Sequence, residues 1–240
     1  MRQAVLLDRL GGLPYHALVA AGLVAAGAGC IRGLKSIAPA DLLPTAADTV
    51  SMWAAEFQPR APLQYELRWR FENNQGTSAG RAAVRYAPPD TLRFDYRGPF
   101  GKSGSAVIVG NNPIWAAPEG DFQDLVPVAP ILWAALGIVI PPGDGATTAG
   151  RDEPRWRAWR YVNGEEAIDF IYQRGPAPRL QAEVRHGERV AGVVSLELAP
   201  EALRPTRAVM RFPAGGSRLT FTVLALDSVA AFPPETWRRS

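Results

Sequence analysis

Short segments in which large apolar residues alternate with charged ones recur through most of the chain after residue 60. The clearest of these segments has the sequence Tyr65-Glu66-Leu67-Arg68-Trp69-Arg70-Phe71. Because successive side chains of a strand point to opposite faces, this period of two places four large apolar groups on one face and the charges on the other. A helix would scatter the same residues around its surface, so the pattern favours a mainly β fold.

The same alternation predicts about eleven strands. They cover residues 65–71, 81–86, 92–97, 105–109, 114–116, 156–161, 167–172, 180–184, 190–198, 206–212 and 219–226. Turn-forming Asn, Gly and Pro residues separate most of them, which indicates that neighbours in sequence pair antiparallel. We therefore predict a mainly β (α+β) domain, built as one large curved antiparallel sheet or open β-barrel.

Two helical pieces interrupt the strands. Apolar residues spaced three and four apart over 46–57 predict a helix that Thr45 caps and Pro59 ends. A second piece begins with a short helix at Asp121 and continues as a helix from Pro130 to Gly137.

The N-terminal region has the layout of an export signal. Arg2 and Arg9 precede an apolar run over 17–28, which is well short of the roughly 20 residues that cross a bilayer. We expect a signal peptide over 1–29, a tether over 30–44 that contains Pro39 and Pro44, and a folded body over 45–240.

The end of this leader, Ala28-Gly29-Cys30, resembles the lipobox of bacterial lipoproteins. The resemblance implies cleavage before Cys30, lipidation of that cysteine by acyl groups such as palmitate, and a place in the cell envelope. Gly27 departs from the pattern, in which Leu or Val is usual three residues before the cysteine. Cleavage at another site and an uncleaved anchor therefore stay open.

Composition argues against several functional classes. The formal net charge is only +3, and the arginines are spread along the chain, so we predict no nucleic-acid binding. Cys30 is the only cysteine and His186 the only histidine after the leader, which leaves no material for a His/Cys metal site. His186 falls in an expected hairpin turn. We predict no metal, no cofactor and no catalytic residues, and hence no enzyme.

Apolar side chains exceed what a thin sheet needs, and they are the candidate ligand-binding residues. Those on the strands share the inward face, and those of the second helical piece lie over its mouth: Leu67, Trp69, Val84, Phe94, Tyr96, Ile108, Phe170 and Tyr172, with Ile131 and Leu132. They either fill the barrel, as in many small barrels, or hold an apolar guest such as an acyl chain, each buried CH₂ of which contributes about 0.8 kcal/mol.

The segment Leu92-Arg93-Phe94-Asp95-Tyr96-Arg97-Gly98-Pro99-Phe100-Gly101, followed by a strand and the helical piece, resembles the LolA/LolB family of lipoprotein carriers. The layout matches over roughly residues 45–237, and Cys30 makes LolB, an outer-membrane lipoprotein, the closer relative. The resemblance implies a half-open barrel with an N-terminal helix and a helical lid over a cavity for lipid or lipoprotein acyl chains. It also implies a periplasmic carrier protein as partner and the periplasmic face of an outer membrane as location.

In such proteins an exposed apolar residue between the third and fourth strands takes part in passing cargo to the membrane, and Phe100 occupies that position. A Phe between Pro99 and Gly101 can reach the interfacial region of a bilayer, or it can fold under the barrel rim.

The sequence thus predicts a membrane-anchored lipoprotein that binds acyl chains and helps place them in the envelope. The alternative is a non-catalytic structural or interaction module of the envelope, with a filled barrel and partners on its Arg-bearing outer face.

Overall fold

The computed structural model describes residues 36–120, 126–143 and 145–239. Residues 33–240 form one compact unit, and the whole described hydrophobic core lies within it. This unit therefore contains the core that it needs to fold on its own. Cys30 and the helix expected to begin at Asp121 lie outside the described residues.

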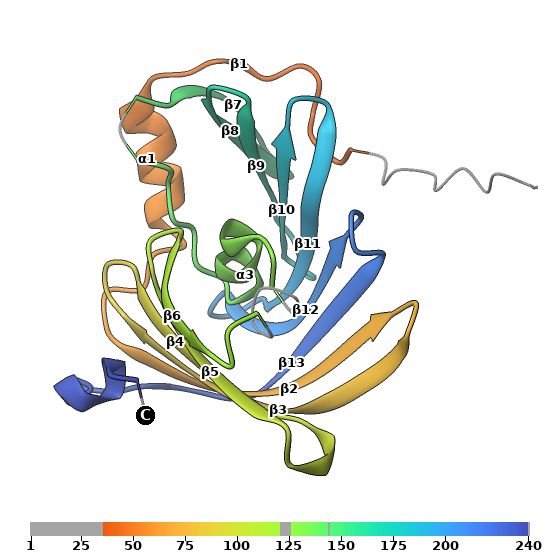
Figure 1. Cartoon of the computed structure of the whole chain (residues 1–240). Coiled ribbons are helices and arrows are strands. Elements are labelled where there is room, and N and C mark those ends of the chain that lie inside the picture. Colours follow the sequence, from red (N-terminus) through yellow and green to blue (C-terminus); the bar gives the residue numbers. More distant parts are fainter. Residues whose placement is uncertain (1–35, 121–125, 144, 240) are drawn as a thin grey trace, which may run out of the picture. The chain divides into compact units, whose positions relative to one another are not determined.

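Thirteen antiparallel strands form one sheet with the order β1-β7-β8-β9-β10-β11-β12-β13-β2-β3-β4-β5-β6. The order is linear, with β1 and β6 at its two edges, so the sheet curves without closing; Figure 1 shows it bent around helix α3. This confirms the predicted open, mainly β architecture. The strands are β1 Leu43–Pro44, β2 Leu63–Asn73, β3 Gly76–Ala87, β4 Thr91–Arg97, β5 Ser103–Val109, β6 Asn112–Ala117, β7 Thr147–Glu153, β8 Trp156–Asn163, β9 Glu166–Gln173, β10 Arg179–His186, β11 Arg189–Ala199, β12 Arg204–Phe212 and β13 Ser217–Ser228.

The alternation read from the sequence matches the burial in the first half of the sheet. Along β2, Tyr65, Leu67 and Trp69 are buried, and the charged residues between them are exposed. In β9, by contrast, all residues over 167–172 are buried. The outer face of that half is covered by the segment that precedes β1, which contacts it through Ser36 and Pro39.

Two of the thirteen strands were not among the predicted ones. The sequence of β7 consists of small, polar and charged residues. It therefore lacks the inward apolar side chains from which the other strands were predicted. Its Gly150 lies beneath the ring of Trp53, so close that a Cβ on the glycine would come within 2.4 Å of the ring. The indole of α1 therefore provides the packing that β7 itself lacks. The two-residue β1 pairs with Gly150 and Ala149.

Two described helices support the sheet, together with the short 3₁₀ turns η1 (Pro99–Gly101) and η2 (Pro234–Trp237). Helix α1 spans Ala47–Ala55 and buries Val50 and Ala54. The prediction that Thr45 caps it is wrong: Ala46 holds the N-cap position, and the Thr45 hydroxyl donates to the carbonyl of Leu43 instead.

Helix α3 spans Ala129–Ala135 and ends before Gly137, whose φ of 76° suits glycine. Pro130, predicted as its first residue, stands second in its first turn, because the helix begins at Ala129. Within the described part of the chain, no helix has the length and apolar character needed to span a bilayer.

Candidate functional site

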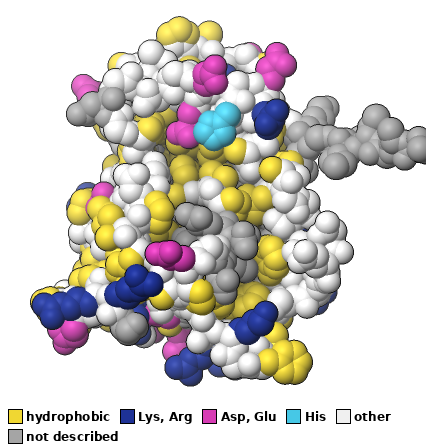
Figure 2. Space-filling view, viewed as in Figure 1, with side chains coloured by type: hydrophobic (Ala, Val, Ile, Leu, Met, Phe, Trp, Pro, Cys, Tyr) yellow, Lys and Arg dark blue, Asp and Glu magenta, His cyan; other side chains and the backbone are white. Residues whose placement is uncertain are grey.

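The concave face of the sheet and the helix α3 together bring all ten candidate ligand-binding residues into one cluster. Every one of them is buried, with Tyr172 the most accessible at 8% exposure. The structure therefore places them together, and the side chains of the described residues pack against one another there. Figure 2 shows hydrophobic side chains gathered around the middle of the view.

Helix α3 covers this face and packs against β10, β11 and β12. Six of its seven residues are buried, including Ile131 and Leu132. Gly192 of β11 permits the close approach, because a Cβ there would lie 3.1 Å from both Ile131 and Phe212. A helix apolar all round is stable only where it is surrounded by protein or lipid.

Two hydrogen bonds, one buried and one partly buried, tie α3 and its C-terminal end to the other half of the sheet. The Trp133 indole donates from Nε1 to the carbonyl of Gly110 at 2.7 Å. The Tyr65 hydroxyl, on β2, donates to the carbonyl of Leu136 at 3.0 Å. Burial raises the pKa of Tyr65 above its ordinary value, so its hydroxyl stays a donor throughout the physiological range.

Stacked aromatic rings line the concave face on both sides of α3. Trp159 and Phe170 stack with centroids 5.3 Å apart, and Phe94 stacks on Phe221 at 5.9 Å. Trp159 and Phe221 were not among the lining residues predicted from the sequence. Both stand at inward positions of predicted strands, so the alternation alone contained the signal for them.

The loop from β4 to β5 presents Phe100 to solvent. Its side chain is completely exposed, at 101% relative accessibility, and its φ of 56° and ψ of 31° place it in the left-handed region. A non-glycine residue there costs about 1 kcal/mol or more, and such strain clusters at functional sites. The alternative in which Phe100 folds under the rim does not apply to this structure.

Trp69 supports the base of this loop from the inward face. Its Nε1 donates to the carbonyl of Arg81 at 3.1 Å, and its ring lies 3.3 Å from where a Cβ on Gly98 would stand. Gly80 completes the packing, since a Cβ there would fall 1.9 Å from the Arg97 carbonyl oxygen. The loop therefore projects from a rigid base.

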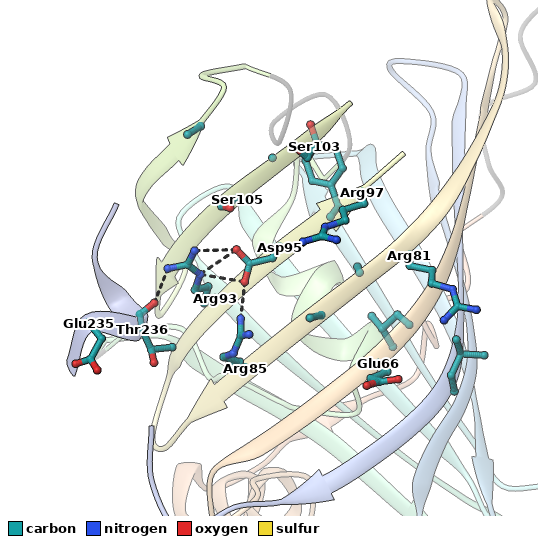
Figure 3. Close-up of a pocket in the computed structure, with 17 residues that line it drawn as sticks. Glu66, Arg81, Arg85, Arg93, Asp95, Arg97, Ser103, Ser105, Glu235 and Thr236 are labelled. Atoms are coloured by element: carbon teal, nitrogen blue, oxygen red, sulfur yellow. Dashed lines mark hydrogen bonds and ion pairs between the residues drawn. The ribbon is translucent and has the colours of Figure 1, made fainter. Parts of the chain in front are cut away.

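A groove of about 820 Å³ crosses the outer face of β2 to β5. Figure 3 shows arginines along it. Arg85 and Arg93 both pair with Asp95, at 2.5 and 2.9 Å. Arg93 also donates to the carbonyl of Thr236, so the C-terminal segment forms one border of the groove. Its floor is made of small residues, among them Ala83.

A second polar cluster lies on the outer face of β8 to β10. Asp169 and Glu183 are almost fully buried. Arg185 pairs with both carboxylates, at 2.9 and 3.1 Å. Glu183 also accepts hydrogen bonds from the Ser36 hydroxyl at 2.6 Å and the backbone N–H of Ile37 at 2.7 Å. The segment at Ser36 and Ile37 is therefore held against the sheet by buried charge.

The structure assembles no recognisable catalytic group around His186. Its ring is 57% exposed and its Nε2 lies 4.0 Å from a carboxylate oxygen of Glu166, at the exposed end of β10. Over the described ranges, no three His, Cys, Asp or Glu side chains converge as metal ligands would.

Comparison with known proteins relates the chain to others through its fold. No protein-family model and no curated protein sequence matches it. The solved structure of a LolA superfamily protein from Nitrosomonas europaea aligns with a TM-score of 0.50 at 11% identity, over 81% of this chain and 98% of that one. This chain thus has a LolA-like fold.

Two further solved structures align less well. One is an outer membrane lipoprotein-sorting protein domain from Vibrio parahaemolyticus, with a TM-score of 0.42 at 7% identity over 79% of this chain and 94% of that one. The other is a DUF1329 family protein from Desulfovibrio piger, with a TM-score of 0.42 at 10% identity over 79% and 95%.

Proposed function

We propose that this protein binds acyl chains of lipids or lipoproteins between the concave face of its sheet and α3, and helps to place them in the cell envelope. The observation that carries this proposal is the way in which the concave face is covered. The apolar surface is covered there by the seven-residue helix α3, the segment 136–140 and helix α1, rather than by a second sheet. So short a helix has little stability of its own in water and depends on its packing.

The binding step follows from that dependence. An acyl chain that takes the place of α3 against the inward side chains of β10, β11 and β12 restores the apolar contacts that the helix gives up, and each buried CH₂ contributes about 0.8 kcal/mol. From there the chain extends to the proposed ligand-binding residues Leu67, Phe94 and Phe170. Leu136 and Gly137 follow the helix, and the buried residues Ile138, Val139 and Ile140 connect it to Pro141. Val139 donates its backbone N–H to the Phe57 carbonyl at 3.1 Å, so the release of α3 includes this hydrogen bond as well as the packing of the helix.

Membrane attachment is the second part of the proposal. Cys30, at the end of Ala28-Gly29-Cys30, is the proposed lipid-modified residue, with residues 1–29 as signal peptide and 30–44 as tether to the LolA-like body. Phe100 is the proposed membrane-contact residue. In an envelope with two membranes, the proposed location is the periplasmic face of the outer membrane, where a periplasmic carrier protein delivers the cargo.

The attachment can be tested on the full chain. The Cys30→Ala variant is expected to leave the membrane fraction and to lose incorporation of an alkyne-labelled palmitate supplied to the cells. A variant that keeps both its label and its membrane association refutes lipidation at Cys30.

A second candidate function is a non-catalytic interaction module of the envelope. The observation that favours it is the packing of the concave face, where all ten candidate residues are buried, together with the open groove on the outer face. In this version the interior is only a core, and protein partners bind the arginine-bearing surface.

Native mass spectrometry of residues 33–240, purified from bacteria, separates the two candidates. A carrier is expected to copurify with lipid and to exchange it for a fluorescent acyl probe that palmitate then competes away. A folded domain that carries no lipid and does not take up the probe refutes the carrier and favours the interaction module.

A further inference from the structure

Three arginines stand side by side on the outer face of the sheet. Arg68 of β2 is directly opposite Arg81 of β3, and Arg81 is directly opposite Arg97 of β4. All three are exposed. Neighbouring strands lie about 4.8 Å apart, so the three arginines occupy adjacent positions across three strands, and we call them the arginine row.

Among the described residues, the arginine row differs from Arg85 and Arg93 of the groove in having no ion-pair partner. Arg85 and Arg93 share Asp95, whereas no described carboxylate forms an ion pair with Arg68, Arg81 or Arg97. Like charges directly opposite each other in a sheet are destabilising. An anionic ligand would relieve the repulsion in this row.

The arginine row ends at the base of the Phe100 loop. Arg97 is the last residue of β4, and the loop from Gly98 to Lys102 follows it directly, closed by a hydrogen bond from the Gly98 N–H to the Lys102 carbonyl at 2.7 Å. Lys102 is exposed as well. The loop projects from the lower edge of the sheet in Figure 1, and dark blue Lys and Arg side chains gather along the lower edge of Figure 2.

A bilayer surface can interact favourably with Phe100 and with the arginine row at the same time. An exposed aromatic ring gains by entering the interfacial region, and basic residues beside it gain by approaching anionic headgroups. An acidic peptide along the arginine row would neutralise the charges but would leave Phe100 in water. We infer that Arg68, Arg81, Arg97 and Lys102 form a contact surface for anionic phospholipid headgroups, which orients the protein so that Phe100 enters the bilayer. The inference rests on the proposed role of Phe100 at a membrane.

Vesicle cosedimentation of residues 33–240, which lack the lipid anchor, tests the contact surface. Vesicles of phosphatidylcholine alone are compared with vesicles of phosphatidylcholine and phosphatidylglycerol in equal parts. The variant is R68Q/R81Q/R97Q. The matched control is R60Q/R155Q/R189Q, which removes the same charge from three exposed arginines outside the arginine row that have no ion pair in the described structure.

The unmodified domain is expected to bind the anionic vesicles, more weakly as salt is raised, and to ignore phosphatidylcholine. Each basic residue at an anionic surface strengthens binding about five-fold, so the triple variant should bind at least about 10-fold more weakly and the control almost normally. Equal binding to both vesicle types, or equal loss in variant and control, overturns the inference.

Two further measurements distinguish the contact surface from the acyl site and from a site for an acidic peptide. Uptake of the fluorescent acyl probe by the triple variant should equal that of the unmodified domain. Normal uptake without vesicle binding refutes the contact surface alone, whereas vesicle binding without uptake refutes only the carrier. A polyglutamate peptide that binds through the arginine row while anionic vesicles do not would assign the row to an acidic protein partner and overturn the lipid assignment.

Discussion

Replacing Tyr65 with Phe should make the proposed acyl site easier to open. The change removes the hydroxyl that donates to the Leu136 carbonyl at 3.0 Å and keeps the ring, which is 1% exposed and packs in the core. Loss of one such bond, with a buried carbonyl left without its donor, costs about 1.5 kcal/mol. For a domain of this size the melting temperature should fall by about 3 to 6 °C.

Loss of the Tyr65 hydrogen bond also weakens the packing of α3 over the concave face, because the bond forms only while α3 is in place. A destabilisation of about 1.5 kcal/mol raises the ratio of open to covered molecules about 10-fold. When the open form is the minor one, the apparent affinity for a ligand of that form rises in proportion to its population. Tyr65→Phe should therefore bind a fluorescent acyl probe up to about 10-fold more tightly while being less stable.

Tyr86→Phe is the matched control. Its hydroxyl donates to the carbonyls of Pro89 at 3.0 Å and Pro59 at 3.3 Å, neither of which belongs to α3. This variant should lose a similar amount of stability without binding the probe more tightly. Probe titration and thermal unfolding of the three proteins decide the matter: a Tyr65→Phe domain that melts lower but binds the probe no better refutes the opening of α3.

Four other changes test separate parts of the structure. Phe100→Glu should leave the melting temperature within about 1 °C but impair delivery of a lipoprotein to vesicles. The control Ile114→Glu, at an exposed apolar site elsewhere, should deliver normally. Equal delivery by both variants removes Phe100 from the mechanism. Gly80→Ala should cost about 3 kcal/mol or more in urea unfolding, because its Cβ meets the Arg97 carbonyl at 1.9 Å, and Gly143→Ala, with open space around it, should cost almost nothing. Glu183→Gln should cost about 2 kcal/mol and expose the segment around Ser36 to limited proteolysis; an unchanged cleavage pattern would show that this carboxylate does not hold the segment. Alkaline pH should destabilise the domain, because burial raises the folded-state pKa of Tyr65 above its ordinary value of 10.0 and that of Tyr86 to about 12. Stability should therefore be constant up to about pH 10 and then fall, by about 1.4 kcal/mol per pH unit for Tyr65, and a flat profile in urea unfolding would contradict it.

The inward face could be predicted from the sequence because it depends on a local rule. Once Tyr65 and Trp69 are assigned to one strand, the period of two places them on the same face, whatever the strand pairs with. Helix α3 was predictable for a similar reason, since Pro130 and Gly137 mark its start and end locally. The ten candidate residues thus reached one cluster through rules that act within a few residues.

Features that depend on distant packing could not be predicted in the same way. Gly150 gives β7 no apolar signal, because the ring that covers it comes from Trp53, about a hundred residues earlier. Asp169 and Glu183 look like ordinary outward-facing charges in their strands. They are buried because the segment at Ser36 crosses the outer face at that point, and no rule within the strands places it there.

The arginine row shows how a site can depend on register alone. In the sequence Arg68, Arg81 and Arg97 are three of many arginines that alternate with apolar residues. Arg68 and Arg97 each have a carboxylate two positions away in the same strand, and Arg81 has another arginine four positions away. A shift of β3 by two residues against β2 and β4 would place Ala83 between Arg68 and Arg97, and the row would be broken. The register that prevents this shift is fixed at the loop base, where the Trp69 Nε1 donates to the Arg81 carbonyl and Gly80 lies against the Arg97 carbonyl. The same contacts that support the Phe100 loop therefore align the arginine row beside it. The proposed membrane surface requires this alignment, because Phe100 and the arginines must meet the same bilayer.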